Sequence, residues 1–209
     1  FEKNNHNLGL TFVQSVNQRR NEYFRNKASN LQNDILGIYG LLSAEFNEPL
    51  ISASDRTLVS FVGRAQYDYK NKYYLTASFR SDGSSVFGDN NKWGYFPAVA
   101  LGWNIHKEEF MERLDALNNL KLRFSYGSVG NEAIGPYGSL STANQNDYIF
   151  NGQISTGYIP GNSLPNPNLK WETSTTFNSA LDFGLWNNRV TGTFEYYNTR
   201  TKDLLVSKT

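Results

Sequence analysis

The side chains that could carry chemistry in this chain are charged residues on one side of alternating, strand-like segments. They are Arg64, Arg80, Lys121 and Arg123 among the bases, and Asp68, Asp82, Glu172, Asp182 and Glu195 among the acids. Because successive side chains of a strand point to opposite faces, this placement gathers the charges on one face. Such a face can line a path for a polar solute, or its charges can form ion pairs with another part of the protein or simply stay hydrated. We favour the second interpretation.

Two of these carboxylates could form a catalytic pair. Glu172 and Glu195 could face one another across a hairpin, as the carboxyl groups of a glycosidase do, although two hydrated carboxylates are the interpretation we favour. His6 and His106 lie far apart and lack the spacing of a metal site. The sequence has no Gly-x-Ser-x-Gly elbow, phosphate loop or dinucleotide fingerprint. We therefore expect no enzyme, no cofactor, and no catalytic or metal-binding residue.

Aromatic residues in the predicted loops are a second set of candidates. Trp93, Tyr137, Tyr148 and Tyr158 could stack on the apolar faces of sugar rings, but packing between loops explains them equally well and is favoured. The weak candidates for substrate contact are therefore Arg64, Arg80, Arg123, Glu172, Trp93 and Tyr137. The oxygen-rich runs 89–91 and 144–147 lack the spacing of a known calcium loop.

The elements that position these residues are seven alternating segments. Between 57 and 70, odd positions such as Val59 and Phe61 are apolar, whereas even positions include Arg64 and Asp68. The segments are 6–19, 57–70, 73–82, 95–105, 120–128, 170–185 and 189–199. One apolar face, one polar face and aromatic residues near the ends are typical of a membrane β-barrel wall. We expect the following residues to face lipid: Leu75, Phe79, Leu101, Leu122 and Leu181.

The links between these segments alternate in length. The short links are 69–72, 106–119 (with one helical turn) and 186–189, and the long links are 20–56, 83–94 and 130–169. Short turns at one end and long loops at the other are the pattern of an outer-membrane barrel, in which the long loops are extracellular. Loops of this length are uncommon in compact soluble domains.

The composition excludes several classes of protein. With 20 basic and 19 acidic residues there is no electrostatic case for nucleic acid, and the absence of cysteine excludes disulfides. The uncharged stretch 35–44 is too short for a spanning helix, and Phe1-Glu2-Lys3 does not begin like a signal peptide. Seven strands would leave unpaired edges, which lipid does not tolerate. We therefore expect residues 1–209 to be a partial barrel domain.

Short motifs add a family resemblance. The first is Asp82-Gly83-Ser84-Ser85 with Phe87, and the second is Trp93-Gly94-Tyr95-Phe96-Pro97 with Gly102-Trp103. The third is Leu120-Lys121-Leu122-Arg123, followed by Ser125-Tyr126-Gly127 and Gly130-Asn131, and the fourth is Asn166-Pro167-Asn168-Leu169-Lys170-Trp171-Glu172. The fifth is Asp182-Phe183-Gly184-Leu185, followed by Asn188-Arg189, Tyr196-Tyr197 and Thr201 through Leu205. Over about 59–205 this order resembles the barrel of SusC/RagA-type TonB-dependent outer-membrane transporters. We expect residues 82–85 to form a turn in which Gly83 supplies unusual backbone angles.

The resemblance implies energised import across the outer membrane. In that family a barrel of about 22 strands surrounds a plug. A SusD-like surface lipoprotein caps the mouth, the TonB complex acts through the plug, and the cargo is an oligosaccharide or peptide. The sequence contains neither the plug nor the TonB-contacting segment. It would supply wall strands in contact with outer-membrane lipid.

Three alternatives remain open. The chain could belong to a structural or adhesive outer-membrane barrel, or to a soluble β-sandwich that binds carbohydrate. A sandwich should carry polar residues on the outward face of each strand, whereas the second face here is apolar. A barrel enzyme such as a lipase would need a Ser/His pair on one strand face, and the sequence does not offer one.

Overall fold

The computed structural model describes residues 2–3, 5–30, 35, 37–43, 46–114, 116–161 and 164–206. They fall into two compact units, which are Phe1–Asn17 with Leu58–Thr209, and Gln18–Thr57. Parts of the predicted links 20–56, 106–119 and 130–169 lie outside the described residues, as does Phe1.

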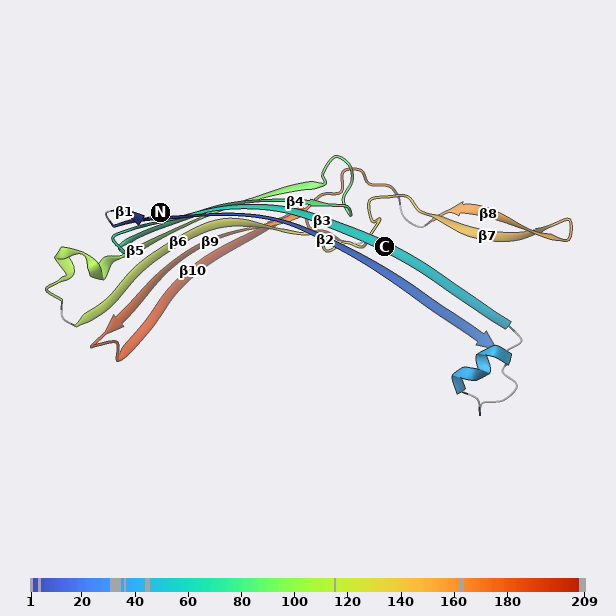
Figure 1. Ribbon diagram of the computed structural model, residues 1–209, viewed down its shortest axis with the longest axis horizontal. Coiled ribbons are helices and arrows are strands. Elements are labelled where there is room, and N and C mark those ends of the chain that lie inside the picture. The colour runs from blue at the N-terminus through green and yellow to red at the C-terminus, as the bar shows by residue number, and fades with distance from the viewer. Residues whose placement is uncertain are drawn as a thin grey trace. The chain divides into compact units, whose positions relative to one another are not determined.

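The described chain is all-β and its strands pair antiparallel. The strands are β1 (Glu2–Lys3), β2 (His6–Ser29), β3 (Phe46–Tyr69), β4 (Tyr73–Ser84), β5 (Trp93–Asn104), β6 (Leu117–Asn131), β7 (Ala143–Phe150), β8 (Gln153–Pro160), β9 (Glu172–Leu185) and β10 (Val190–Lys202). One sheet has the order β1-β2-β3-β4-β5-β6-β9-β10, and β7 pairs with β8 alone (Figure 1). The seven predicted strands are confirmed as β2 to β6, β9 and β10, and the two-residue β1 is an addition.

Two of the predicted long links contain strands. β2 continues to Ser29 and β3 begins at Phe46, so much of the link 20–56 is hairpin. The link 130–169 contains the β7–β8 hairpin, whose turn residues Asn151 and Gly152 both have positive φ. These segments have no apolar face, and hydrogen bonding between backbones does not require one. The prediction that these two links are loops along their whole length is therefore wrong.

The short links agree with expectation. The link after β5 contains two 3₁₀ turns, η2 (Ile105–Lys107) and η3 (Glu109–Met111). A further 3₁₀ helix, η1 (Gly37–Ser43), lies in the other unit. The turn between β9 and β10 has positive φ at Trp186, Asn187 and Asn188. No helix among the described residues is both long and apolar enough to cross a membrane.

The strand registers sort the side chains of the larger unit into two faces. Arg64 lies opposite Ser78, which lies opposite Ala98, and the row continues through Gly127, Thr176 and Thr199. We call the face that contains this row the polar face. The adjacent row runs through Ala65, Ala77, Val99, Tyr126, Phe177 and Asn198, and belongs to what we call the apolar face. The predicted alternation is thus preserved across six strands.

A small core lies at one end of the sheet, where two family motifs meet. Its buried members are Val86, Phe87, Phe96 and Trp171. The rings of Phe87 and Trp171 have centroids 4.8 Å apart, and the Trp171 indole N–H donates to the carbonyl of Lys92 at 3.1 Å. We call these four residues the rim cluster. It ties the β4–β5 loop to the segment that leads into β9.

Two glycines near this cluster allow close approach between chain segments. A Cβ atom on Gly88 would lie 2.2 Å from the carbonyl oxygen of Pro167, and one on Gly83 would lie 2.9 Å from the Trp93 ring. Gly83 belongs to β4 and is not among the described residues with positive φ. The prediction that it supplies unusual turn angles is therefore wrong, because its role is to leave room for the indole.

Candidate functional site

The polar face carries ion pairs that cross from strand to strand. The Arg123 guanidinium on β6 donates two hydrogen bonds to the carboxylate of Asp182 on β9, at 2.7 and 2.9 Å. The Thr193 hydroxyl on β10 donates to the same carboxylate at 2.9 Å. The register makes this possible, since Asp182 lies opposite both Lys121 and Thr193. Three strands are thereby joined through one acid.

A second group lies on β3 and β4, and it surrounds a hollow. Arg80 donates to both carboxylate oxygens of Asp82, at 2.9 and 2.6 Å, and to the Ser60 hydroxyl at 3.3 Å. Arg64, Arg80 and Asp82 line a depression of about 390 Å³. Within the described residues, no carboxylate lies within ion-pair distance of Arg64. Its charge is thus open to an anionic group that enters the hollow.

Between these groups the polar face of β5 is almost bare. Its side chains there are Ala98, Ala100 and Gly102. A Cβ atom on Gly127 of β6 would lie 2.8 Å from the Ala98 Cβ, so the neighbouring strand is also small at this point. We call this strip the β5 trough.

The predicted carboxylate pair does not form. Glu195 lies opposite Ala180 on β9 and accepts a hydrogen bond from the Asn178 amide. Glu172 lies eight residues from Ala180, or roughly 26 Å along the strand. Its carboxylate accepts from the Asn131 amide at 3.2 Å and from the backbone N–H of Leu205 at 3.1 Å. The glycosidase hypothesis is therefore wrong for these two residues.

The aromatic candidates fall in different places. Trp93 begins β5 and is not in a loop, and its ring stacks on Phe61 with centroids 6.2 Å apart. Tyr137 lies between β6 and β7 with φ of 63°. Tyr148 and Tyr158 lie on β7 and β8 and are both exposed. The structure thus does not bring the aromatic candidates together with the arginines.

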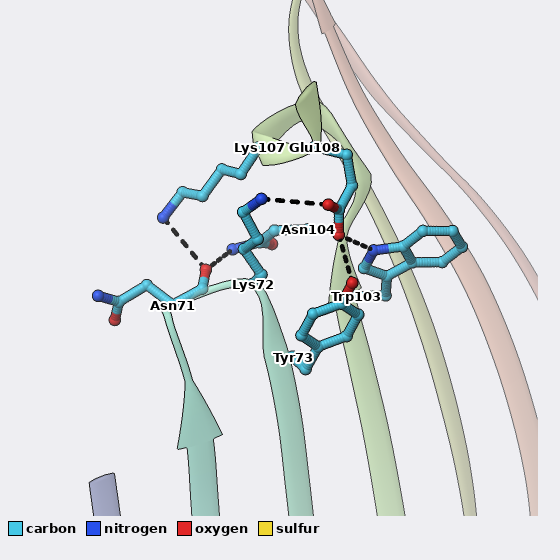
Figure 2. Close-up of polar contacts among 7 residues, drawn as sticks. All are labelled: Asn71, Lys72, Tyr73, Trp103, Asn104, Lys107 and Glu108. Carbon is cyan, nitrogen blue, oxygen red and sulfur yellow. Dashed lines mark hydrogen bonds and ion pairs between the residues drawn. The ribbon is translucent and has the colours of Figure 1, made fainter. Parts of the chain in front are cut away.

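A polar cluster at the short-link end was not anticipated (Figure 2). Glu108, between η2 and η3, accepts hydrogen bonds from the Tyr73 hydroxyl at 2.6 Å, the Trp103 indole at 3.0 Å and the Lys72 ammonium at 3.1 Å. These three bonds lower the pKa of Glu108 to about 2. The carboxylate is therefore ionised at neutral pH. A sequence signal existed, since Lys72 directly precedes Tyr73 at the start of a strand and Glu108 lies in the short link five residues after Trp103.

The same cluster fixes the β3–β4 turn. Lys70 and Asn71 have positive φ, and the Asn71 N–H donates to the Asp68 carboxylate at 3.0 Å. The Asn71 carbonyl accepts from the Asn104 amide at 2.8 Å and from the Lys107 ammonium at 3.2 Å. We call the residues of Figure 2 the turn cluster.

Aromatic rings on the apolar face form rows near both ends of the strands. At the turn-cluster end, Tyr73 stacks between Tyr69 and Trp103, with centroids 6.3 and 6.4 Å apart. At the other end Phe79 stacks on Tyr95 at 6.0 Å. Tyr95 and Trp103 are eight residues apart on β5, which is roughly 26 Å. An apolar band about 25 Å tall between aromatic girdles is the outer surface of a membrane barrel.

The whole chain matches one known protein family. Residues 1–209 match the family model described as TonB dependent receptor-like, beta-barrel. The chain belongs to this family. TonB-dependent receptor β-barrels are outer-membrane proteins, and the similar proteins found are receptors and transporters, so the chain does not group with enzymes.

Individual relatives of the family agree with this assignment. The chain is 36% identical to the TonB-dependent receptor P26 of Formosa agariphila, over 98% of this chain and 21% of that protein. It is 42% identical to the TonB-dependent receptor SusC of Bacteroides thetaiotaomicron, over 78% of this chain and 17% of that protein. The solved structure of the RagAB peptide transporter matches with a TM-score of 0.84 and 26% identity, over 98% of this chain and 22% of that one. The chain therefore spans about a fifth of the relatives it matches.

Proposed function

We propose that residues 1–209 are a partial barrel domain in the wall of a TonB-dependent outer-membrane transporter. The observation that carries the proposal is the division of one sheet into two faces. The polar face holds the ion pairs Arg123–Asp182 and Arg80–Asp82, whereas the apolar face ends in rows of aromatic rings. Such a sheet suits a wall with water on one side and lipid on the other.

The cargo we propose is an oligosaccharide or another large nutrient such as a peptide. The similar proteins include one named SusC and one described as a peptide transporter. Arg64 and the hollow beside it are the polar-face feature most open to an incoming group. Arg80, Arg123 and Glu172 are already engaged by neighbours, so in our proposal they hold the wall in register.

The partners we propose follow the same family. A SusD-like surface lipoprotein would dock at the long-loop end, and the TonB complex would act through a plug region carried elsewhere in the protein. In this arrangement the rim cluster faces the cell exterior and the turn cluster faces the periplasm.

A soluble carbohydrate-binding sandwich is less well supported. A sandwich packs two sheets face to face over a shared core. Within the described residues the buried hydrophobic side chains are Val86, Phe87, Phe96, Trp171 and Ala180, four of them in the rim cluster. A structural or adhesive barrel would share this wall and differs from a transporter only in needing no energy source.

Growth of cells that depend on the full-length protein tests the proposal. A deletion strain should lose growth on the oligosaccharide or peptide cargo and regain it with the wild-type gene, but only when the TonB complex is active. Arg64→Glu should reduce growth with an anionic cargo, and Arg113→Glu, a charge reversal in the exposed β5–β6 link, serves as its control. Growth that is independent of TonB would favour the adhesive or structural barrel.

A further inference from the structure

The hollow on β3 and β4 keeps one positive charge that this wall does not neutralise. Arg80 shares the carboxylate of Asp82, and the closest N–O distance between them is 2.6 Å. Arg64 lines the same hollow, and within the part of the chain that the structure describes it has no such acid. Two guanidinium groups and one carboxylate leave a formal charge of +1, and Arg64 carries it.

The strand register keeps acids away from Arg64. The residue opposite it on β4 is Ser78, and its polar-face neighbours along β3 are Val62 and Gln66. The next acid further along β3 is Asp68, four residues or roughly 13 Å away, and its carboxylate accepts a hydrogen bond in the β3–β4 turn. The guanidinium of Arg64 is therefore surrounded by neutral side chains.

The hollow also has apolar walls. Phe96, Val62 and Val129 line it together with Arg64, and its volume of about 390 Å³ is within the range of small-ligand sites. The Phe96 ring is fixed in place, because it is 5% exposed and fills the space that Gly130 leaves on β6, where a Cβ atom would overlap the ring. A free cation beside fixed apolar walls suits an acidic group that is carried on a ring or an aliphatic stem.

The hollow lies between the two aromatic girdles and nearer the long-loop end. Ser78, opposite Arg64, lies opposite Ala98 on β5. Ala98 is three residues from Tyr95 and five from Trp103, or roughly 10 and 16 Å. A solute that enters from the long-loop end reaches this level only after it has passed the rim cluster. The hollow is thus placed on the path through the barrel and inside its mouth.

We propose that Arg64, with the Ser78 hydroxyl, binds a carboxylate of the cargo during its passage through the barrel. The planar guanidinium donates two parallel hydrogen bonds to a carboxylate, and one carboxylate matches the single positive charge of the hollow. The carboxylate belongs to a uronic acid of an oligosaccharide or to a peptide. This proposal rests on the proposed function, since the polar face must line the path of the cargo.

A cysteine reporter in the full-length protein tests whether Arg64 attracts anions. Ser78→Cys would be introduced with any other cysteine replaced, and its reaction with an anionic sulfonatoethyl and a cationic trimethylammonioethyl methanethiosulfonate would be followed by mass spectrometry. Arg64→Gln should lower the ratio of the anionic to the cationic rate about tenfold, because the charge attracts one reagent and repels the other. The ratio cancels any change in the reactivity of the thiol itself.

Two further variants serve as controls for the reporter. Lys121→Gln removes a positive charge from the same face, and Lys121 lies opposite Asn104, six residues or roughly 20 Å along β5 from Ala98. At that distance salt screens the charge, so the ratio should stay unchanged. Arg64→Lys should keep most of the preference for the anionic reagent, which separates the effect of charge from a change in folding.

Protection of the same cysteine identifies the source of the carboxylate. A neutral reagent, methyl methanethiosulfonate, would be used with trigalacturonate or N-acetyl-trialanine, and their neutral counterparts galactotriose and N-acetyl-trialanine amide are the controls. We expect one acid to slow the reaction when Arg64 is present, and the protection to be lost in Arg64→Gln. The acid that protects shows whether the cargo carboxylate is that of a sugar or of a peptide.

Three results would overturn the proposal. A reporter that no reagent modifies would show that the rest of the protein covers the hollow, and an equal rate ratio with Arg64 and with Arg64→Gln would show that another part of the protein neutralises the charge. Protection by neither acid would refute binding of a cargo carboxylate. TonB-dependent growth of the wild-type strain is measured in parallel, so a failure of the transport proposal is seen separately.

Discussion

The Tyr73 hydroxyl donates a 2.6 Å hydrogen bond to the Oε1 atom of Glu108, 35 residues further along the chain. The Trp103 indole donates to the same oxygen at 3.0 Å, and the two rings stack on neighbouring strands. The Tyr73 hydroxyl and the Trp103 indole N–H therefore share one acceptor, a carboxylate that lies outside the strands. This geometry fixes the orientation of both rings at the end of the sheet.

The turn cluster should make folding stability depend on pH in acid. The folded-state pKa of Glu108 is about 2, below its ordinary value of 4.5, so the stabilisation is complete above about pH 4.5 and is lost as pH falls toward 2. In urea titrations of the full-length protein, the wild-type midpoint should approach that of Glu108→Gln across this window. Glu109→Gln, one residue away and exposed, is the control and should track wild type. A constant difference between wild type and Glu108→Gln down to pH 2 would contradict the role of the carboxylate.

The two ends of the strands should lie on opposite sides of the membrane. Single cysteines at Asn90, in the β4–β5 loop, and at Asn187, in the β9–β10 turn, would be exposed to a membrane-impermeant reagent on intact cells. We expect labelling of Asn90→Cys and not of Asn187→Cys, because long loops of outer-membrane barrels are extracellular. The reverse pattern would contradict this orientation.

A charge on the apolar face should cost far more than the same charge on the polar face. Leu101 and Ala100 are neighbours on β5 that point to opposite faces. Leu101→Arg should destabilise the folded barrel by ~2–4 kcal/mol, whereas Ala100→Arg enters the β5 trough and should cost much less. Folded yield in outer membranes, measured by heat-modifiable gel mobility, reports the difference. Equal yields would be incompatible with a lipid-facing surface at Leu101.

The rim cluster should hold the loops at its end of the sheet. Trp171 is buried against Phe87 and Phe96, so Trp171→Ala should cost roughly 3–5 kcal/mol and loosen the segment that leads into β9. Protease added to intact cells should then cut between residues 132 and 170 faster than in wild type. Trp186→Ala, at an exposed turn, should leave the cleavage rate unchanged. Unchanged cleavage in Trp171→Ala would argue that the cluster does not restrain the loops.

The isolated chain 1–209 should not behave as a soluble monomer. Each end of its sheet, at β1 and at β10, has an outer strand edge with no neighbouring strand in the described residues. One face also exposes rings such as Phe79, Tyr95 and Tyr196 to water. Unpaired edges and exposed apolar surface both promote association. Light scattering without detergent should show oligomers or aggregate. A monodisperse monomer with a cooperative melt would favour the sandwich after all.

The alternation of apolar and polar side chains could be predicted from the sequence, because it depends only on neighbouring residues within one strand. Arg64, Phe79 and Leu101 lie on the faces that their parity predicts, and the registers carry that parity across the sheet. Strand extent was less readable. β2 beyond Arg19 has no apolar face, so hydrophobicity carries no signal where backbone pairing continues. Contacts between three separate elements were the hardest to predict. Glu108 reaches Tyr73 and Lys72 only when the β3–β4 turn, β4 and the β5–β6 link lie side by side in the fold.

The trough formed by Ala98, Ala100 and Gly102 has a mechanical consequence. Depressions of about 320 Å³ flank it, and their lining includes the short side chains Thr76, Ser125 and Gly127. Beside Ala98 and Ala100 the strip presents only short side chains, whereas at Gly102 the side chain of Lys121 lies against it and Arg123 lines the adjacent depression. A segment moving along this wall would therefore meet the fewest long side chains beside Ala98 and Ala100.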